Sequence, residues 1–555
     1  MHRRQRAWVP IAILMVISLF AAACGDSDDD GGEDAGGAAD TTTAAAGETT
    51  EGTTEGTADD TAAPAEEGEA QRGGRLIIGV PDEATLGFDP STTAVGVGGA
   101  TMALSIYDTL AAYNAEGVAV PFLAESIEAN EDATEWTVTL RPGIQFHDGT
   151  PLNAEAVKAT FDKHVEAGRV IQEGFTMEVV DDLTIVFTFL APFGAFPDNM
   201  ASQWSWIKSP TAEAELGADY TNNPVGTGPY VFEEWVRDDH LTLVRNENYW
   251  RDDVALLDEI EFRPIIDDSV RKAALEAGDV DAIVVGAGDI DDFRAQDEFQ
   301  VFETSAGVEA VSFNMTQPPM DDLRVRQALA MAIDVPAVIE GVFDGVGVPA
   351  TGPLPHDNPY YHEVEYPTYD PETAAALIEE YETETGTQVE FEYLFSDVPL
   401  DQELAQLLQS YWQEVGADVT LGAPLPEPDL QNRRAEVQYD VVVNGMAPVI
   451  DPDPWLILFR SDSFLNYGAS NSPEIDAAVD ASRSGQTTEE RAAAYATLQE
   501  ELAAQLGWFF TRDAVVAVAA REGVNGIDGW TVPDGSPGLG EQFWLPFQVE
   551  SLWVE

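Results

Sequence analysis

Residues 132–157 read DATEWTVTLRPGIQFHDGTPLNAEAV, and this stretch determines how the chain around it folds. Trp136, Val138 and Leu140 alternate with threonines, and this period of two predicts a half-buried strand. A Pro-Gly and an Asp-Gly turn dipeptide then bracket a second short strand, expected at 144–147. Two adjacent strands joined by a tight turn are therefore expected here.

A helix should follow these strands directly. Asn153 is a good N-cap residue, and Glu155 falls in the first turn, where the helix dipole favours an acid. The whole stretch thus predicts a compact α+β unit.

The same run resembles the signature of one protein class, the peptide-binding class of ABC-transporter solute-binding proteins, which includes oligopeptide, dipeptide and nickel binders. Further segments that are typical of this class follow in the expected order. They are NPVGTGPY at 223–230 with RNENYW at 245–250, DLRVRQAL at 322–329 with AID at 332–334, YDPETAAAL at 369–377, and SNSPEID at 470–476. The resemblance covers roughly residues 74–555.

The resemblance implies an α/β (α+β), two-lobed periplasmic-binding-protein-like fold with an extra subdomain in the first lobe. It implies that lobe I comprises 74–307 plus 515–555, with the subdomain at about 109–205, and that lobe II comprises 308–514. The two hinge crossings between lobes would fall near 308–314 and 506–514. Independently, a chain of 555 residues exceeds what one core usually holds. After about residue 307, alternating helix and strand patterns predict a partly parallel sheet.

The first 24 residues have the features of an export signal. Three arginines precede the apolar run Val9–Ala23, which is short for a membrane span. Small residues then lead to Cys24, the only cysteine of the chain. This placement resembles a bacterial lipobox, although Ala21 stands where leucine is usual, and it implies a lipid anchor on Cys24. The Sec and twin-arginine export routes both remain open.

Residues 25–73 contain mainly Asp, Glu, Gly, Ala and Thr. Such a composition cannot bury enough apolar surface to offset the entropy of ordering, so we expect a disordered acidic tether.

The net charge is −75. A charge of this sign disfavours nucleic acid and anionic membrane surfaces as partners. The acids are spread along the whole chain, which favours a solvated acidic surface, suited to salty surroundings, over a cation-binding site.

Sequence motifs of catalysis and metal binding are absent. The chain has no His-Glu-x-x-His, no Gly-x-Ser-x-Gly, no phosphate-binding Gly-rich loop and no cysteine pair, and its six histidines lack metal-ligand spacing. His147, inside the signature, is interpreted as structural. The sequence therefore predicts a protein that is not an enzyme and has neither a metal site nor a cofactor.

The resemblance places the solute between the lobes, beside the loop that begins near Asn444. Peptide binders of the class have Gly-Trp there, then an aspartate for the ligand amine, then Asp-Pro. Here Met446 replaces the tryptophan, Pro448-Val449 replace the amine-binding aspartate, and Asp451-Pro452 matches the downstream pair. The loop at 395–400 also lacks the arginine with which dipeptide binders hold the carboxylate.

The absent charged anchors weigh against a zwitterionic dipeptide, because its buried charges would stay unpaired. Longer peptides, or uncharged or cationic solutes, are favoured. The candidate ligand-binding residues are Phe88, Trp204, Trp206, Phe313, Asn444, Met446, Ala447, Asp451 and Trp508. On an extended segment, Trp204 and Trp206 are expected to face the same side.

The sequence therefore predicts a monomeric, extracytoplasmic, lipid-anchored protein at the outer face of the cytoplasmic membrane. It would capture a small solute between two lobes and deliver it to the transmembrane subunits of an ABC permease. A sensory protein that reports the solute to a receptor would have the same sequence features. A secreted hydrolase is the third alternative, which the absent catalytic motifs disfavour.

Overall fold

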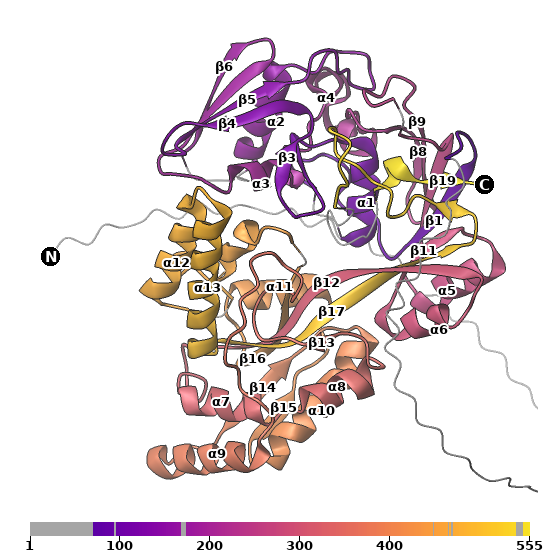
Figure 1. Cartoon of the computed structure of the whole chain (residues 1–555). Helices are drawn as coiled ribbons and strands as arrows, with labels where there is room; N and C mark the ends of the chain where they lie inside the picture. The colour runs from indigo at the N-terminus through magenta and orange to yellow at the C-terminus, as the bar shows by residue number, and fades with distance from the viewer. Residues whose placement is uncertain are drawn as a thin grey trace, which may run out of the picture. The chain divides into compact units, whose positions relative to one another are not determined.

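The structure is a computed structural model that describes residues 70–93, 96–167, 174–252, 254–447, 449–463, 466–467, 470–539 and 548–555. The predicted signal with Cys24, and the predicted tether up to residue 69, lie outside these residues. Helices and strands are mixed along the described chain (Figure 1), which confirms the α/β class. We use the names lobe I and lobe II for the two parts predicted above.

An eleven-stranded sheet forms the framework of both lobes, in the order β15-β14-β16-β12-β17-β11-β1-β10-β9-β8, with β13 paired to β17. On the lobe I side the strands are β1 (Arg75–Val80), β8 (Tyr230–Val236), β9 (His240–Arg245), β10 (Glu259–Pro264) and β11 (Ala282–Val285). On the lobe II side they are β13 (Val348–Pro349), β14 (Glu390–Leu394), β15 (Asp418–Leu421) and β16 (Val441–Met446). Strand β14 is parallel to both β15 and β16, so the prediction of a partly parallel sheet is confirmed.

Two long strands, β12 (Phe299–Phe313) and β17 (Trp508–Arg521), belong to both halves of this sheet (Figure 1). They pair with each other along their length, while β11 pairs with the end of β17 and β16 pairs with the end of β12. Between these regions the ladder shifts register from Ser305 to Gly307, where the glycine has a φ of +92° that favours a residue without Cβ. Both segments predicted to cross between lobes overlap these strands.

Within residues 132–157, strand β5 (Glu135–Leu140) belongs to a four-stranded antiparallel sheet. Its order is β4 (Ala124–Ala129), β5 (Glu135–Leu140), β7 (Thr184–Thr188) and β6 (Thr176–Asp181), and helix α2 (Ala154–Glu166) contacts β6 and β7. Asn153 caps α2 as predicted, because its side chain accepts a hydrogen bond from the Ala156 amide at 2.9 Å.

The predicted short strand at 144–147 is wrong. Only an isolated bridge between Gln145 and Pro151 forms there. The Phe146 amide donates to Thr150 and the Gly149 amide donates back to Phe146, so the turn closes on itself. The residues between the two turns find no continuous partner strand, so the single bridge does not extend into a ladder. His147 is structural in this arrangement, with Nε2 3.0 Å from the Gly228 carbonyl.

Helices cover the lobe II strands. One core lies under α7 (Leu323–Met331), α9 (Pro371–Thr385) and α10 (Pro399–Glu414), and a second lies under α12 (Pro473–Ser484) and α13 (Thr488–Gln505). The remaining helices of this lobe are α8 (Val335–Val342) and α11 (Glu427–Ala435). Those of lobe I are α1 (Val97–Ile106), α3 (Phe196–Met200), α4 (Pro210–Leu216), α5 (Asp268–Ala277) and α6 (Ile290–Arg294).

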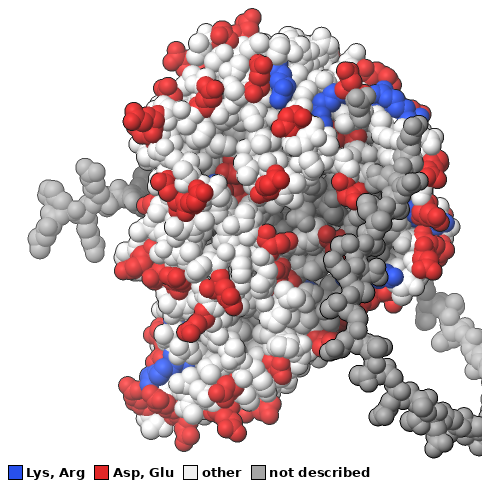
Figure 2. Space-filling view, viewed as in Figure 1, with Lys and Arg blue, Asp and Glu red and all other residues white. Residues whose placement is uncertain are grey.

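Two minor sheets complete the described elements. They are β2 (Ala111–Tyr113) with β3 (Ala119–Pro121), and β18 (Val524–Asn525) with β19 (Trp553–Val554). On the surface, acidic side chains are scattered over the whole face shown in Figure 2, with few basic ones among them.

Candidate functional site

A cavity of about 230 Å³ lies in lobe II between the sheet and helices α8 and α10. Its wall is mostly aliphatic and is formed by Ala310, Val311, Ile333, Val335, Val338, Ile339, Phe343, Leu404, Leu408 and Val443. Its polar lining is Glu309, Tyr393, Asp401, Arg434, Asn444, Thr511 and Arg512. Strands β12 and β17, which both lobes share, form one side of it.

The local sequence patterns explain why these side chains converge. Val311 on β12 lies opposite Val443 on β16, so the two valines share one face of the sheet. On α8 the cavity residues follow the helical spacing of three and four from Val335, and on α10 they are four residues apart, Leu404 and Leu408. Two helix faces and one sheet face therefore meet around the space.

Charged groups of both signs stand at the polar side. The Arg512 guanidinium forms two contacts with the Glu309 carboxylate, at 3.0 and 2.5 Å, and lies 3.6 Å from the ring centre of Phe343. Arg434 donates from Nε to the Val443 carbonyl at 2.9 Å. Asp401 accepts a hydrogen bond from Ser396. Two arginines face two acids, so the cavity has a balanced charge.

This arrangement suits an apolar group with a polar group attached. An engineered cavity of about 150 Å³ lined by aliphatic residues is known to hold benzene. A cavity of 230 Å³ can therefore hold an aliphatic or aromatic side chain, while hydrogen-bonding groups at its polar side fix the orientation.

A larger hollow of about 630 Å³ lies in lobe I, with Arg141, Trp250, Arg251 and the segment 531–533 in its lining. It contains none of the candidate ligand-binding residues and does not touch the shared strands β12 and β17. The cavity in lobe II is therefore the stronger candidate for receiving part of a solute, because it contains a candidate residue and lies against the strands that both lobes share.

Of the candidate residues, Asn444 lines the cavity. Its side-chain amide donates to the Ser312 hydroxyl at 3.0 Å, and its carbonyl oxygen accepts the Gly445 amide at 3.0 Å. These bonds fix the side chain against the sheet.

Most of the aromatic candidates lie in cores instead. Phe88 packs in the core of lobe I, 4.7 Å from the Trp235 ring, while Phe313 and Trp508 pack in the two cores of lobe II. Met446 is buried with Trp508. In this conformation these four residues pack against protein and do not reach the cavity, so ligand contact by them stays a prediction.

Trp204 and Trp206 do not face the same side, and that prediction is wrong. A short 3₁₀ turn at Gln203–Ser205 replaces the expected extended segment. Trp206 is consequently buried in the core of lobe I, and Trp204 packs against the subdomain core, 5.8 Å from the His164 ring.

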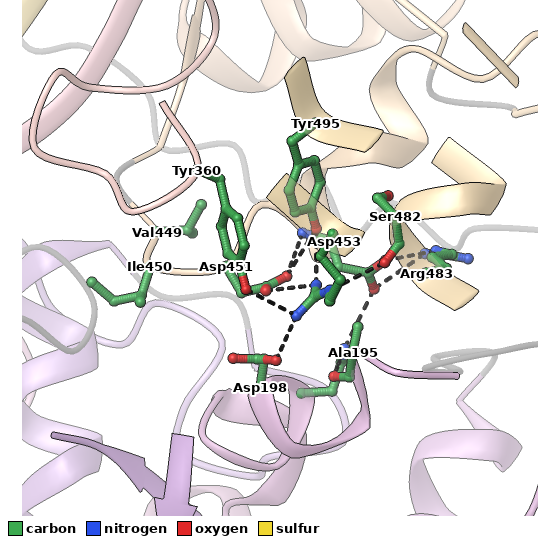
Figure 3. A network of polar contacts seen from close by, with 12 residues as sticks. Ala195, Asp198, Tyr360, Val449, Ile450, Asp451, Asp453, Ser482, Arg483 and Tyr495 are labelled. Atoms are coloured by element: carbon green, nitrogen blue, oxygen red, sulfur yellow. Dashed lines mark hydrogen bonds and ion pairs between the residues drawn. The ribbon is translucent and has the colours of Figure 1, made fainter. Parts of the chain in front are cut away.

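The loop after β16 leads from the cavity to the boundary between the lobes. Ala447 is half-buried in this loop, and Asp451 is buried at its end. Figure 3 shows Asp451 within a network that includes Asp198, Asp453, Arg483, Tyr360 and Tyr495. Asp451 therefore contacts protein groups rather than the cavity.

The sequence analysis missed Arg434, Arg512 and Glu309. One signal could have found the arginines, because Lys and Arg together number only 26 against 101 acids. A basic residue in such a chain is rare enough to examine individually. Their approach to one cavity depends on tertiary structure, since they come from α11, β17 and β12.

Within the described ranges, no group of three or more His, Cys, Asp or Glu side chains is placed to hold a metal ion. The described part of the chain likewise contains no helix long and apolar enough to cross a membrane.

The chain is similar in sequence to bacterial solute-binding proteins. The family model for bacterial extracellular solute-binding proteins, family 5 Middle, matches residues 118–466. A glutathione-binding protein GsiB of Pectobacterium atrosepticum is 29% identical over 458 residues, which cover 78% of this chain and 87% of the relative. The GsiB protein of Shigella flexneri is 31% identical over 345 residues, 61% of this chain and 66% of that protein.

Solved structures show the same fold. NikA from Brucella suis, in complex with Fe(III)-EDTA, has a TM-score of 0.76 at 22% identity, covering 87% of this chain and 100% of that one. DppA from Helicobacter pylori, in complex with the peptide STSA, has a TM-score of 0.74 at 21% identity over 87% and 99%. AgaA from A. tumefacien R10, in complex with agropinic acid, has a TM-score of 0.72 at 27% identity over 87% and 99%.

Proposed function

Because the chain belongs to family 5 of the bacterial extracellular solute-binding proteins, we propose that its cavity in lobe II receives an apolar group of the solute. The protein is the extracytoplasmic, solute-binding component of an ABC import system. It captures a peptide or another small solute between two lobes and delivers it to the permease. Its family and its structural neighbours are solute-binding proteins rather than enzymes.

One observation carries the placement of the solute. The cavity combines an aliphatic wall with charge-balanced polar groups, and it lies against β12 and β17, the strands that both lobes share. A solute there would contact the strands that connect the two lobes, and binding favours a closed form if the solute contacts that form more strongly.

The class of solute follows from the same lining. The relatives are named for glutathione, and neighbours of the same fold were solved with a peptide, with agropinic acid and with a metal chelate. In this chain both nearby arginines already contact protein oxygens, from Glu309 in one case and Val443 in the other. We infer a solute whose apolar group enters the cavity and whose polar groups form hydrogen bonds, such as a peptide longer than a dipeptide.

We also propose that the protein is anchored to the membrane by lipid on Cys24 and works as a monomer. The small residues before Cys24 support the anchor, and residues 25–73 are long enough to connect it to the folded part.

The experiment is to identify the solute that co-purifies with the protein. The full chain is purified under native conditions from its own host, and intact-complex mass spectrometry measures the extra mass. The released compound is then titrated back by calorimetry. The proposal predicts one binding site and a compound with an aliphatic or aromatic group. Recovery of a small, fully polar compound, such as a free sugar, would contradict it.

A further inference from the structure

A buried ionic cluster joins the subdomain of lobe I to lobe II (Figure 3). Asp198, from α3 of the subdomain, accepts a hydrogen bond from Arg491 on α13 at 2.7 Å. The other terminal nitrogen of Arg491 lies 2.6 Å from Asp451, and Nε donates to the Ser482 carbonyl at 3.1 Å. One guanidinium therefore contacts carboxylates from both lobes.

Further contacts between the two lobes surround this pair. Asn199 donates to Asp453 at 3.3 Å, and Asp453 in turn pairs with Arg483 at 2.7 Å. The Gly194 amide donates to the Arg483 carbonyl at 2.7 Å. The chains approach so closely that a Cβ at position 194 would clash with the Gly485 carbonyl.

The charges of the cluster do not balance. Lobe II contributes two acids, Asp451 and Asp453, and two arginines, Arg483 and Arg491, which neutralise each other. Lobe I contributes one charged group, the Asp198 carboxyl, whose side chain is only 13% exposed beside an Arg491 side chain that is 4% exposed. The contact between the lobes thus places one unmatched negative charge in a buried, already neutral site, which is costly.

We propose that closing of the two lobes is coupled to the uptake of one proton by Asp198, so that acid favours the closed, solute-retaining form and alkali favours release. This inference uses the two-lobed closure of the proposed function, but it does not depend on which solute binds. Neutral Asp198 keeps its hydrogen bond with Arg491 without adding charge to the interface.

The groups around Asp198 support this direction. The pKa of Asp198 is raised to about 8, mainly by burial and further by the negative charges of Asp451 and Asp453, while Arg491 opposes the rise. Burial also raises the pKa values of Tyr113, Tyr360 and Tyr495, so these hydroxyls stay neutral. For Arg491, burial lowers the pKa but Asp451 and the other neighbours outweigh it, so this group stays charged. Arg483 stays paired with Asp453.

The sign of the pH effect follows from these groups. In the open form Asp198 faces water and ionises near pH 4, the ordinary value for aspartate. In the closed form it retains its proton up to about pH 8. Between these limits the closed form holds one more proton, so the ratio of closed to open protein falls by at most about tenfold for each unit that the pH rises.

The test measures closure without any solute. Small-angle X-ray scattering of the full chain at pH 5.5, 7.0 and 8.5 gives the radius of gyration, and hydrogen exchange of residues 194–200 reports the contact directly. The wild type should expand and lose protection in this segment as the pH rises. Asp198→Asn, which keeps a hydrogen-bond acceptor but cannot ionise, should remain closed and protected at all three values.

Two variants serve as references. Asp182→Asn removes one exposed acid of the same subdomain and should follow the wild type, which separates the effect from general charge repulsion. Gly194→Ala introduces the Cβ that clashes with Gly485, so it should stay open at every pH. The proposal is overturned if wild-type protection at 194–200 does not change with pH, or if Asp198→Asn keeps the wild-type profile. Solute binding is tested separately, by calorimetric titration with the co-purified compound, so neither result would bear on it.

Discussion

Filling the cavity from one of its walls should strongly weaken solute binding without unfolding the protein. Val443 on β16 lines the cavity, and Val443→Phe would place a ring inside it. A space of about 150 Å³ holds benzene, so the ring would occupy more than half of the 230 Å³.

The magnitude follows from the cavity volume. Unfilled apolar space reduces stability by about 24 cal/mol per Å³, so a solute group that fills 230 Å³ gains at most about 5.5 kcal/mol. Loss of that gain corresponds to a decrease in affinity of up to roughly ten-thousandfold. We expect at least a ~100-fold loss for Val443→Phe, because part of the solute still contacts the polar side.

The assay is calorimetric titration with the co-purified compound, together with the melting temperature of each variant. The melting temperature should stay within a few degrees of wild type, because the gain from filled space offsets local crowding. The matched control is Val180→Phe, the same substitution on strand β6 at a position that is 57% exposed and outside the cavity. An affinity for Val443→Phe within about threefold of wild type, in a folded protein, would show that the solute binds elsewhere.

Replacing Cys24 with Ser should release the protein from the membrane fraction into the soluble extracellular fraction, and unchanged retention would rule out the lipid anchor. The melting temperature should rise between low salt and 1 M NaCl. The acidic side chains behind the net charge of −75 repel one another, and 1 M salt screens this repulsion by shortening the Debye length to about 3 Å. A flat or falling melting temperature would mean that the acids are neutralised in another way. Calorimetry with a panel of di- and tripeptides should detect weak or no binding, because the loops at 395–400 and 444–451 lack charged anchors and each unmet terminus costs roughly 1.5–3 kcal/mol. Submicromolar affinity for a simple dipeptide would contradict this expectation.

Local patterns were sufficient to predict most elements of the fold. The alternation of helices and strands predicted after about residue 307 is present in β14, α10, β15, α11 and β16, which follow one another along the chain. Asn153 was recognised as a cap because the residue type and its position before an apolar helix face determine that bond locally. The strand at 144–147 failed because turn dipeptides indicate where a chain reverses, but not whether the residues between them find a partner strand.

The candidate site could be predicted only in part. Sequence gives the hydrophobicity of Phe88, Phe313 and Trp508, but whether a large ring fills a core or faces a cavity depends on which elements cover it. Asn444 was found because the end of a strand in a recognised motif places it there, whereas Arg512 and Glu309 gave no local signal.

The sequence by itself determined the α/β class, the family and the acidic surface, because these follow from periodicity, motifs and composition along the chain. Only the tertiary structure shows where the cavity in lobe II lies and which charged side chains contact one another. Asp198 and Arg491 are separated by 293 positions yet form one hydrogen bond. The physical reason is that burial and Coulomb energy depend on distance in space, which the order of residues does not specify.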